Sequence, residues 1–222
     1  MDPLNIFKEY SMSLSEAKKQ IKPMDLILFR AGEIISNTIR FIEYIGAASN
    51  DWSHVGLIVN TDIIPSIKNA QPGHLYVWES TLTGNVNDVE SDGSVFGVQI
   101  RPLDALVAEY NKDYTNSAVA WTKLENNPCE RRDSEGIEEY ELRITKLRKI
   151  LCELHQKFYH ETYELNILKL LSAVFPCLRQ FRDIIDIGQE WKFCSELVAT
   201  IYCSIGVLNP EQVDPENVLP LP

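Results

Sequence analysis

The stretch WKFCSELV at positions 191–198 places a cysteine directly before an apolar run, a pattern typical of a thiol in the first turn of a helix. Only the thiolate form of cysteine is a nucleophile. A helix N-terminus carries about half a positive charge and unpaired N–H groups, and both favour the thiolate. A free cysteine is often an inert core residue, but its place at a helix start makes Cys194 the first candidate nucleophile.

Two upstream residues supply the other groups of a nucleophilic triad. His54 opens the apolar run HVGLIV (54–59), and Glu79 ends the short run LYVWE (75–79). A neighbouring imidazole favours the thiolate and later protonates the leaving group. A carboxylate behind the imidazole holds its orientation. We therefore expect one ring nitrogen of His54 within hydrogen-bonding reach of Cys194 and the other near Glu79. The order histidine, glutamate, cysteine reverses the cysteine-first order of papain.

Four blocks of the sequence resemble, in order, those of the circularly permuted papain-like hydrolases of the NlpC superfamily, in the branch that includes bacterial YiiX-like proteins and a poxviral relative. The blocks are PMDLILF (23–29), WSHVGL (52–57), VWEST (77–81) with GVQIRPL (97–103), and FCSELV (193–198). The resemblance implies Cys194 as nucleophile, His54 as base and Glu79 as the polar third member. Met24 is a departure, because the family usually has a glycine there that shapes a turn.

Hydrophobic periodicity predicts an α+β fold. Strands are predicted at 25–30, 54–60, 75–79, 97–101 and 117–124, and helices at 14–20, 32–45, 103–110, 137–160 and 164–174. The resemblance implies the permuted papain-like (NlpC-type) arrangement, in which a small antiparallel sheet packs with helices. We interpret 1–222 as a single domain with a helical insertion at about 125–190 and an extended proline-rich tail at 209–222.

Composition narrows the function classes. The net charge of -11 argues against a nucleic-acid-binding surface, which needs a basic stripe. No apolar run reaches the roughly 18 residues of a membrane span, which leaves peripheral membrane contact open. Five cysteines without CxxC spacing argue against a disulfide framework and a zinc site. Reduced thiols and the lack of a signal-peptide pattern favour a cytoplasmic protein without metal or cofactor. Nothing in the sequence indicates the oligomeric state.

Other polar residues are weaker candidates. His74 follows Pro-Gly in a loop and is the runner-up base. We assign His155 and His160 to the solvated face of the charged helix, because no third metal ligand lies nearby. Glu139 and Arg143, spaced i,i+4, are expected to form an ion pair. The remaining cysteines are assigned to structural roles: Cys129, Cys152, Cys177 and Cys203.

The predicted chemistry is acyl transfer. The Cys194 thiolate attacks an amide or ester carbonyl, and the thioester is released to water or to another acceptor. Members of the resembling family act on peptides and cell-wall-type amides, and related permuted folds act on lipid acyl groups or ubiquitin-like conjugates. The resemblance therefore implies a peptide-like, amide or acyl-lipid substrate without choosing among them. The alternative is a catalytically silent binding module in which the segment 125–190 holds a protein or lipid partner.

Overall fold

The computed structural model of the chain describes residues 13–30, 52, 54–81, 85–91, 97–113, 117–159 and 194–213. Several sequence-based expectations fall outside these ranges. They are the helices predicted at 32–45 and 164–174, the positions of His160 and Cys177, and the tail beyond residue 213.

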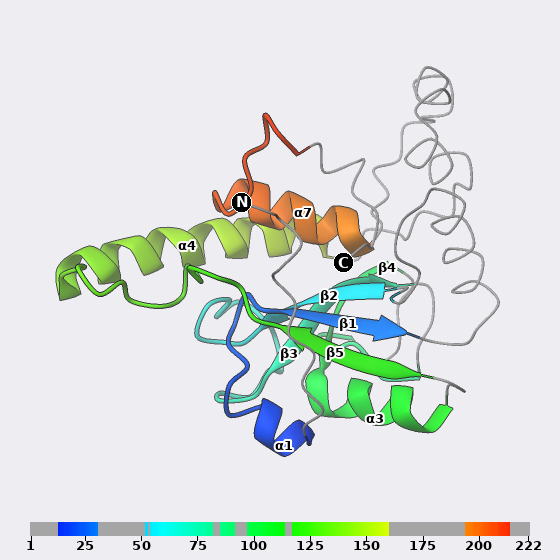
Figure 1. Ribbon diagram of the computed structural model, residues 1–222. Helices are drawn as coiled ribbons and strands as arrows, with labels where there is room; N and C mark the ends of the chain where they lie inside the picture. Colours follow the sequence, from blue (N-terminus) through cyan, green and yellow to red (C-terminus); the bar gives the residue numbers. More distant parts are fainter. Residues whose placement is uncertain are drawn as a thin grey trace, which may run out of the picture.

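A five-stranded antiparallel sheet forms the centre of the described residues (Figure 1). The strands are β1 (Leu26–Arg30), β2 (His54–Val59), β3 (Tyr76–Thr81), β4 (Gly97–Pro102) and β5 (Ala118–Thr122). Their order in the sheet is β4-β3-β2-β1-β5, and all neighbouring pairs are antiparallel. The first four strands thus form a meander, and β5 returns to pair with β1. All five predicted strands are confirmed, with ends that differ by at most two residues.

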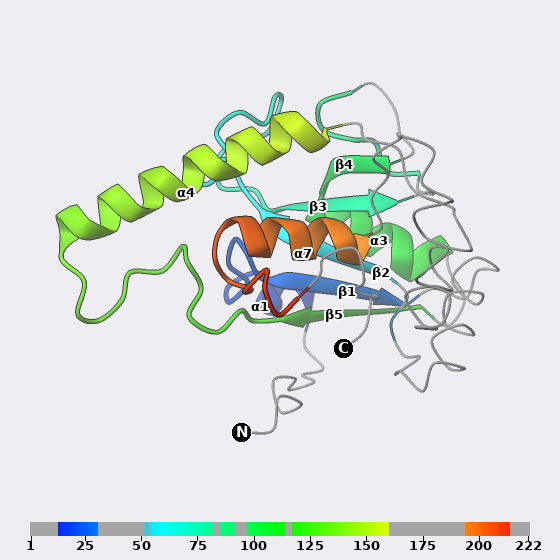
Figure 2. The same cartoon turned by 90° about the horizontal axis from the view of Figure 1, so that it is seen from above.

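Helices lie on both faces of the sheet. Those in the described ranges are α1 (Leu14–Ala17), α3 (Leu103–Asp113), α4 (Ile137–Phe158) and α7 (Cys194–Ser204). Figures 1 and 2 show α4 and α7 on one face, and Figure 1 shows α1 and α3 on the other. Each face has its own apolar cluster, with Leu57 and Trp78 on the α4 and α7 side and Ile58 and Val77 on the other. Neighbouring strand residues divide between the two clusters because strand side chains alternate.

The first helix confirms its predicted capping box. The Ser13 hydroxyl accepts a hydrogen bond from the Glu16 backbone N–H at 3.3 Å, and the Glu16 carboxylate accepts one from the Ser13 N–H at 3.1 Å. These contacts satisfy two N–H groups that a helix start leaves without a partner in the helix. The helix ends at Ala17, earlier than the predicted residue 20, and the chain continues in a turn.

Two side-chain predictions on α4 were wrong. His155 is buried with an exposed fraction of 3%, because steps of three and four from Leu151 bring it and Phe158 to the face that contacts the sheet. Arg143 pairs with Glu135, not with Glu139, through distances of 2.6 Å from Nε to Oε1 and 2.8 Å from Nη2 to Oε2. Glu135 directly precedes the helix N-cap residue, so a loop that folds back supplies the partner.

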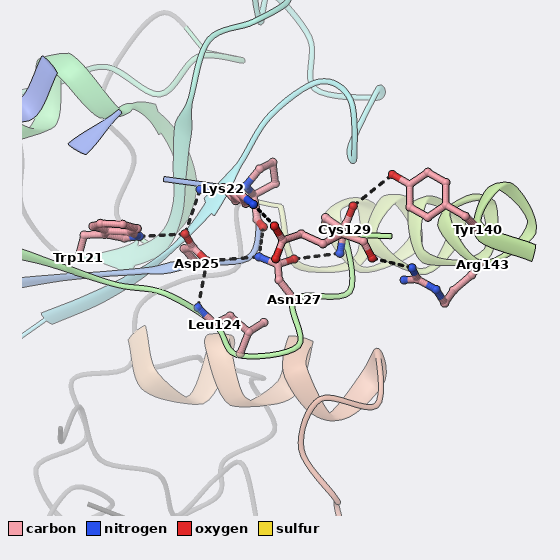
Figure 3. A network of polar contacts seen from close by, with 10 residues as sticks. Lys22, Asp25, Trp121, Leu124, Asn127, Cys129, Tyr140 and Arg143 are labelled. Atoms are coloured by element: carbon pink, nitrogen blue, oxygen red, sulfur yellow. Dashed lines mark hydrogen bonds and ion pairs between the residues drawn. The ribbon is translucent and has the colours of Figure 1, made fainter. Parts of the chain in front are cut away.

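The buried carboxylate of Asp25 joins the start of β1 to the end of β5 (Figure 3). One oxygen accepts hydrogen bonds from the Lys22 backbone N–H and from Trp121 Nε1, both at 2.9 Å. The other accepts from the Leu124 backbone N–H at 3.0 Å and from Asn127 Nδ2 at 3.2 Å. Four donors therefore satisfy a carboxylate that has no exposed surface.

The turn before β1 has a left-handed backbone at Met24, a residue other than glycine. Met24 has a φ of 74°, and its side chain is fully buried in the cluster below α7. Its backbone N–H donates to the Ile58 carbonyl and its carbonyl accepts from the Tyr202 hydroxyl, both at 2.7 Å. A non-glycine residue with positive φ costs about 1–3 kcal/mol and persists where surrounding contacts fix it. Here the β2 and α7 contacts do so.

Candidate active site

The three predicted site residues come from three separate elements. His54 is the first residue of β2, Glu79 lies near the end of β3, and Cys194 is the first residue of α7. Because β2 and β3 are antiparallel, the start of one and the end of the other lie at the same end of the sheet. All three residues are buried.

His54 contacts both of its predicted partners. Its Nε2 lies 2.6 Å from Glu79 Oε2. A side-chain hydrogen bond also links His54 to Cys194. Since Glu79 occupies Nε2, the nitrogen left for the thiol is Nδ1. A neutral imidazole that donates from Nε2 to a carboxylate has an acceptor at Nδ1, so this arrangement can remove the proton of a thiol.

The charges around His54 favour the protonated form of its ring. Burial is the largest influence on the pKa of His54 and lowers it, since it disfavours the charged ring. The charge of Cys194, the hydrogen bond to Cys194 and the contact with Glu79 together outweigh burial and raise the pKa to about 9. His54 therefore carries a proton near neutral pH when Cys194 is a thiolate.

Glu79 has a second partner, Arg101, which is not among the site residues predicted from the sequence. Burial raises the pKa of Glu79. The charge of Arg101 and the hydrogen bond and charge of His54 outweigh burial and bring the pKa down to about 2. Arg101 lies on β4, and its Nε donates a hydrogen bond to Glu79 Oε1. Its Nη1 lies 3.6 Å from Oε2 of Glu109, a residue of α3. An arginine within the predicted strand GVQIR (97–101) was the signal that could have marked it.

Gly56 allows β3 to approach the histidine strand closely. A Cβ atom at this position would lie 2.3 Å from Val77 Cγ1 and 3.4 Å from Glu79 Cβ. Both of these residues belong to β3, so a side chain on β2 would displace the strand that carries the carboxylate. A glycine inside an apolar strand often marks such a close approach. The glycine within the run HVGLIV (54–59) was therefore a signal for this contact in the sequence.

A second buried histidine, His155 of α4, lies on the face of the sheet that α7 also covers. The ring of His155 lies edge-on to the Trp78 ring at 5.9 Å between centroids. Its Nδ1 is 3.4 Å from the Ser66 hydroxyl, and its Nε2 is 3.4 Å from Glu90 Oε2. Burial lowers the pKa of His155 more than the nearby carboxylates raise it. This cluster joins α4 to the loops around Ser66 and Glu90 and is separate from the triad.

The described residues give no support for His74 as the base, for a metal site or for a membrane-spanning helix. His74, the runner-up base, is exposed in the loop before β3. Among the residues that the structure describes, no three His, Cys, Asp or Glu side chains form a group that could hold a metal ion. None of the helices in those ranges is both long and apolar enough to span a lipid bilayer.

No family model matches the chain, and no curated protein is a significant match. The geometry of the site therefore carries the functional argument.

Proposed function

We propose that the chain is a cysteine hydrolase or acyltransferase with a permuted papain-like arrangement, in which Cys194 is the nucleophile, His54 the base and Glu79 the orienting residue. The observation that carries the proposal is the continuous buried contact from Cys194 through His54 to Glu79. A cysteine helix packed against an antiparallel sheet that bears the histidine supports the permuted arrangement.

The proposed reaction uses each group in turn. Nδ1 of His54 takes the thiol proton, and the Cys194 thiolate attacks the carbonyl carbon of an amide or ester. The backbone N–H of Cys194 at the start of α7 stabilises the oxyanion of the tetrahedral intermediate. The imidazolium then protonates the leaving amine or alcohol, and a thioester remains on Cys194. Water or another acceptor, deprotonated by His54, releases the acyl group.

The mechanism has a defined response to alkaline pH. Protonation of the leaving group requires the imidazolium, and the pKa of His54 is raised to about 9. Formation of the thioester should therefore decline as the pH rises through about 9, while alkylation of the thiolate, which needs no proton donor, should not.

The test compares the reactivity of the five cysteines. Iodoacetamide at neutral pH, followed by mass spectrometry of each cysteine peptide, should modify Cys194 about tenfold faster or more than the others. Burial raises the pKa of Cys129 to about 12 and raises that of Cys203, so both should react slowly. The ultraviolet absorbance of the thiolate, measured against Cys194→Ser, gives a second readout that does not depend on access of the reagent.

Histidine variants identify the source of the reactivity. His54→Asn should abolish the preference for Cys194, whereas His74→Asn, a change at an exposed loop histidine, should leave it intact. Equal labelling of all cysteines, together with no thiolate absorbance from Cys194, would contradict the proposal and favour the catalytically silent binding module.

A further inference from the structure

We propose that Arg101, supported by Glu109, is a positioning residue for the Cys194–His54 pair. It holds Glu79 as an ionised carboxylate with one fixed oxygen directed at His54. This inference rests on the proposed function of the same site and adds two residues from different elements, β4 and α3, to the machinery around the thiol.

The first support is the division of the two oxygens of Glu79. Oε1 accepts the hydrogen bond from Arg101 Nε, and Oε2 lies 2.6 Å from His54 Nε2. Rotation of the carboxylate would break both contacts at once. Arg101 therefore fixes the plane of the carboxylate, and this plane determines the direction in which the imidazole ring must lie.

The second support is the burial of the charged groups. Glu79 has no exposed surface, and the exposed fractions of Arg101 and Glu109 are 1% and 6%. A carboxyl group buried without a cation takes up a proton, because water no longer stabilises its charge. A protonated Glu79 could not stabilise an imidazolium, so an ionised Glu79 needs the guanidinium of Arg101.

The third support is the alternation of charge along the contacts. With a thiolate at Cys194, the signs are negative at Cys194, positive at His54, negative at Glu79, positive at Arg101 and negative at Glu109. The carboxylate of Glu109 is itself held by the backbone N–H of a loop residue, which donates to Oε1 at 2.7 Å. Each charge therefore has a neighbour of opposite sign, and the row connects the thiol to α3 on the far face of the sheet.

A second arginine–glutamate pair in the protein provides a matched control. Arg143 contacts Glu135 through Nε and Nη2, and the side chain of Glu135 is almost fully buried. This pair joins the loop before α4 to that helix and has no contact with the triad. Its removal should lower stability without changing the ionisation of Cys194, which separates a structural effect from a positioning effect.

The experiment measures the pH at which acidification has converted half of the Cys194 thiolate to the thiol, here called the half-loss. The readouts are the rate of iodoacetamide alkylation and the thiolate absorbance. The main variant is R101Q/E109Q, which removes one charge of each sign, so that Glu109 is not left as a buried anion without its arginine. Without the guanidinium, Glu79 should protonate within the accessible range, and the half-loss should move up by about one pH unit or more.

Three further variants give the expected pattern. R101K keeps the charge but not the forked geometry of arginine, so its half-loss should lie between wild type and R101Q/E109Q. R143Q should lower the urea midpoint of unfolding and leave the half-loss unchanged. In an E79Q background, replacement of Arg101 with Gln should add no further shift, because Arg101 acts through Glu79.

The outcomes separate the two proposals. If wild-type Cys194 shows no preferential thiolate, the proposed function fails, and the inference that rests on it fails with it. If wild-type Cys194 is reactive but folded R101Q/E109Q keeps the wild-type profile, the inference alone fails. Should R101Q/E109Q not fold, a folded R101K with an unchanged half-loss would overturn the inference.

Discussion

At Gly56 the absence of a side chain lets two strands approach closely at the point where the triad is built. The space that a Cβ would need is occupied by Val77, and Glu79 lies directly beside it. The contact between His54 and Glu79 therefore depends on a residue that contributes no functional group. A larger residue at this position would affect both the stability of the sheet and the geometry of the site.

We predict that Gly56→Ala lowers the free energy of unfolding by about 1–3 kcal/mol, the typical cost of overpacking a core. It should also slow alkylation of Cys194, because Glu79 moves with Val77. Urea unfolding and the iodoacetamide rate measure the two effects. In G56A/V77A the atom that would clash is absent, so the alkylation rate should recover even though the core has one methyl group fewer. An alkylation rate in Gly56→Ala equal to wild type would show that Glu79 does not depend on this approach.

Among the elements, β1 lies between β2 and β5 in the sheet and is preceded by the Met24 turn. Asp25 fixes the residues around its start through four hydrogen bonds, as Figure 3 shows. The Tyr202 hydroxyl connects the same turn to α7. The helix that carries Cys194 is thus joined to the sheet through its last turns as well as through the triad at its first turn.

Asp25→Asn should be strongly destabilising. One acceptor oxygen becomes an NH₂ group that faces two N–H donors, and leaving such donors without partners costs about 2–4 kcal/mol in total. Urea unfolding gives the measurement. Asp62→Asn is the matched control, because Asp62 is exposed and its carboxylate accepts a hydrogen bond from the side-chain amide of Asn60 at 3.1 Å. This change should alter stability by less than about 0.5 kcal/mol. Equal effects of the two changes would contradict the assigned role of Asp25.

For the whole molecule, Glu79 should make stability sensitive to acid. Burial raises its pKa, but Arg101 and His54 lower it to about 2, against an ordinary value of 4.5. A carboxyl whose pKa is lower in the folded state gives stability that is complete above the unfolded pKa and lost as pH falls through the folded one. The free energy of unfolding should therefore fall between pH 4.5 and about 2, by up to about 3 kcal/mol from this group.

Urea unfolding of wild type and Glu79→Gln, near neutral pH and near pH 3, tests this expectation. The variant should lose less stability on acidification than wild type, because glutamine does not titrate. Some acid sensitivity should remain, since a hydrogen bond from Arg143 lowers the pKa of Glu135 to about 2 as well. Identical losses in the two proteins would exclude Glu79 as a source of acid sensitivity.

The sequence predicted those features that depend on local patterns. Apolar runs bounded by turn residues located all five strands, and the spacing of Ser13 and Glu16 located the start of the first helix. The contacts of His54 with Glu79 and Cys194 were also expected, and their catalytic roles stay predictions. The partners of Arg101 and Arg143 were not foreseen, because each depends on how segments distant along the chain fold back on one another.

The placement of Cys194 has a consequence for the protein during its synthesis. The ribosome completes β2 and β3, with His54 and Glu79, long before it reaches α7. Until that helix docks, the histidine has its carboxylate but no thiol, and the cysteine has no imidazole. An isolated cysteine is mostly protonated at neutral pH and is a weak nucleophile. A nascent or partly unfolded chain should therefore be chemically quiet, and the reactive thiolate would arise only as the final step of folding.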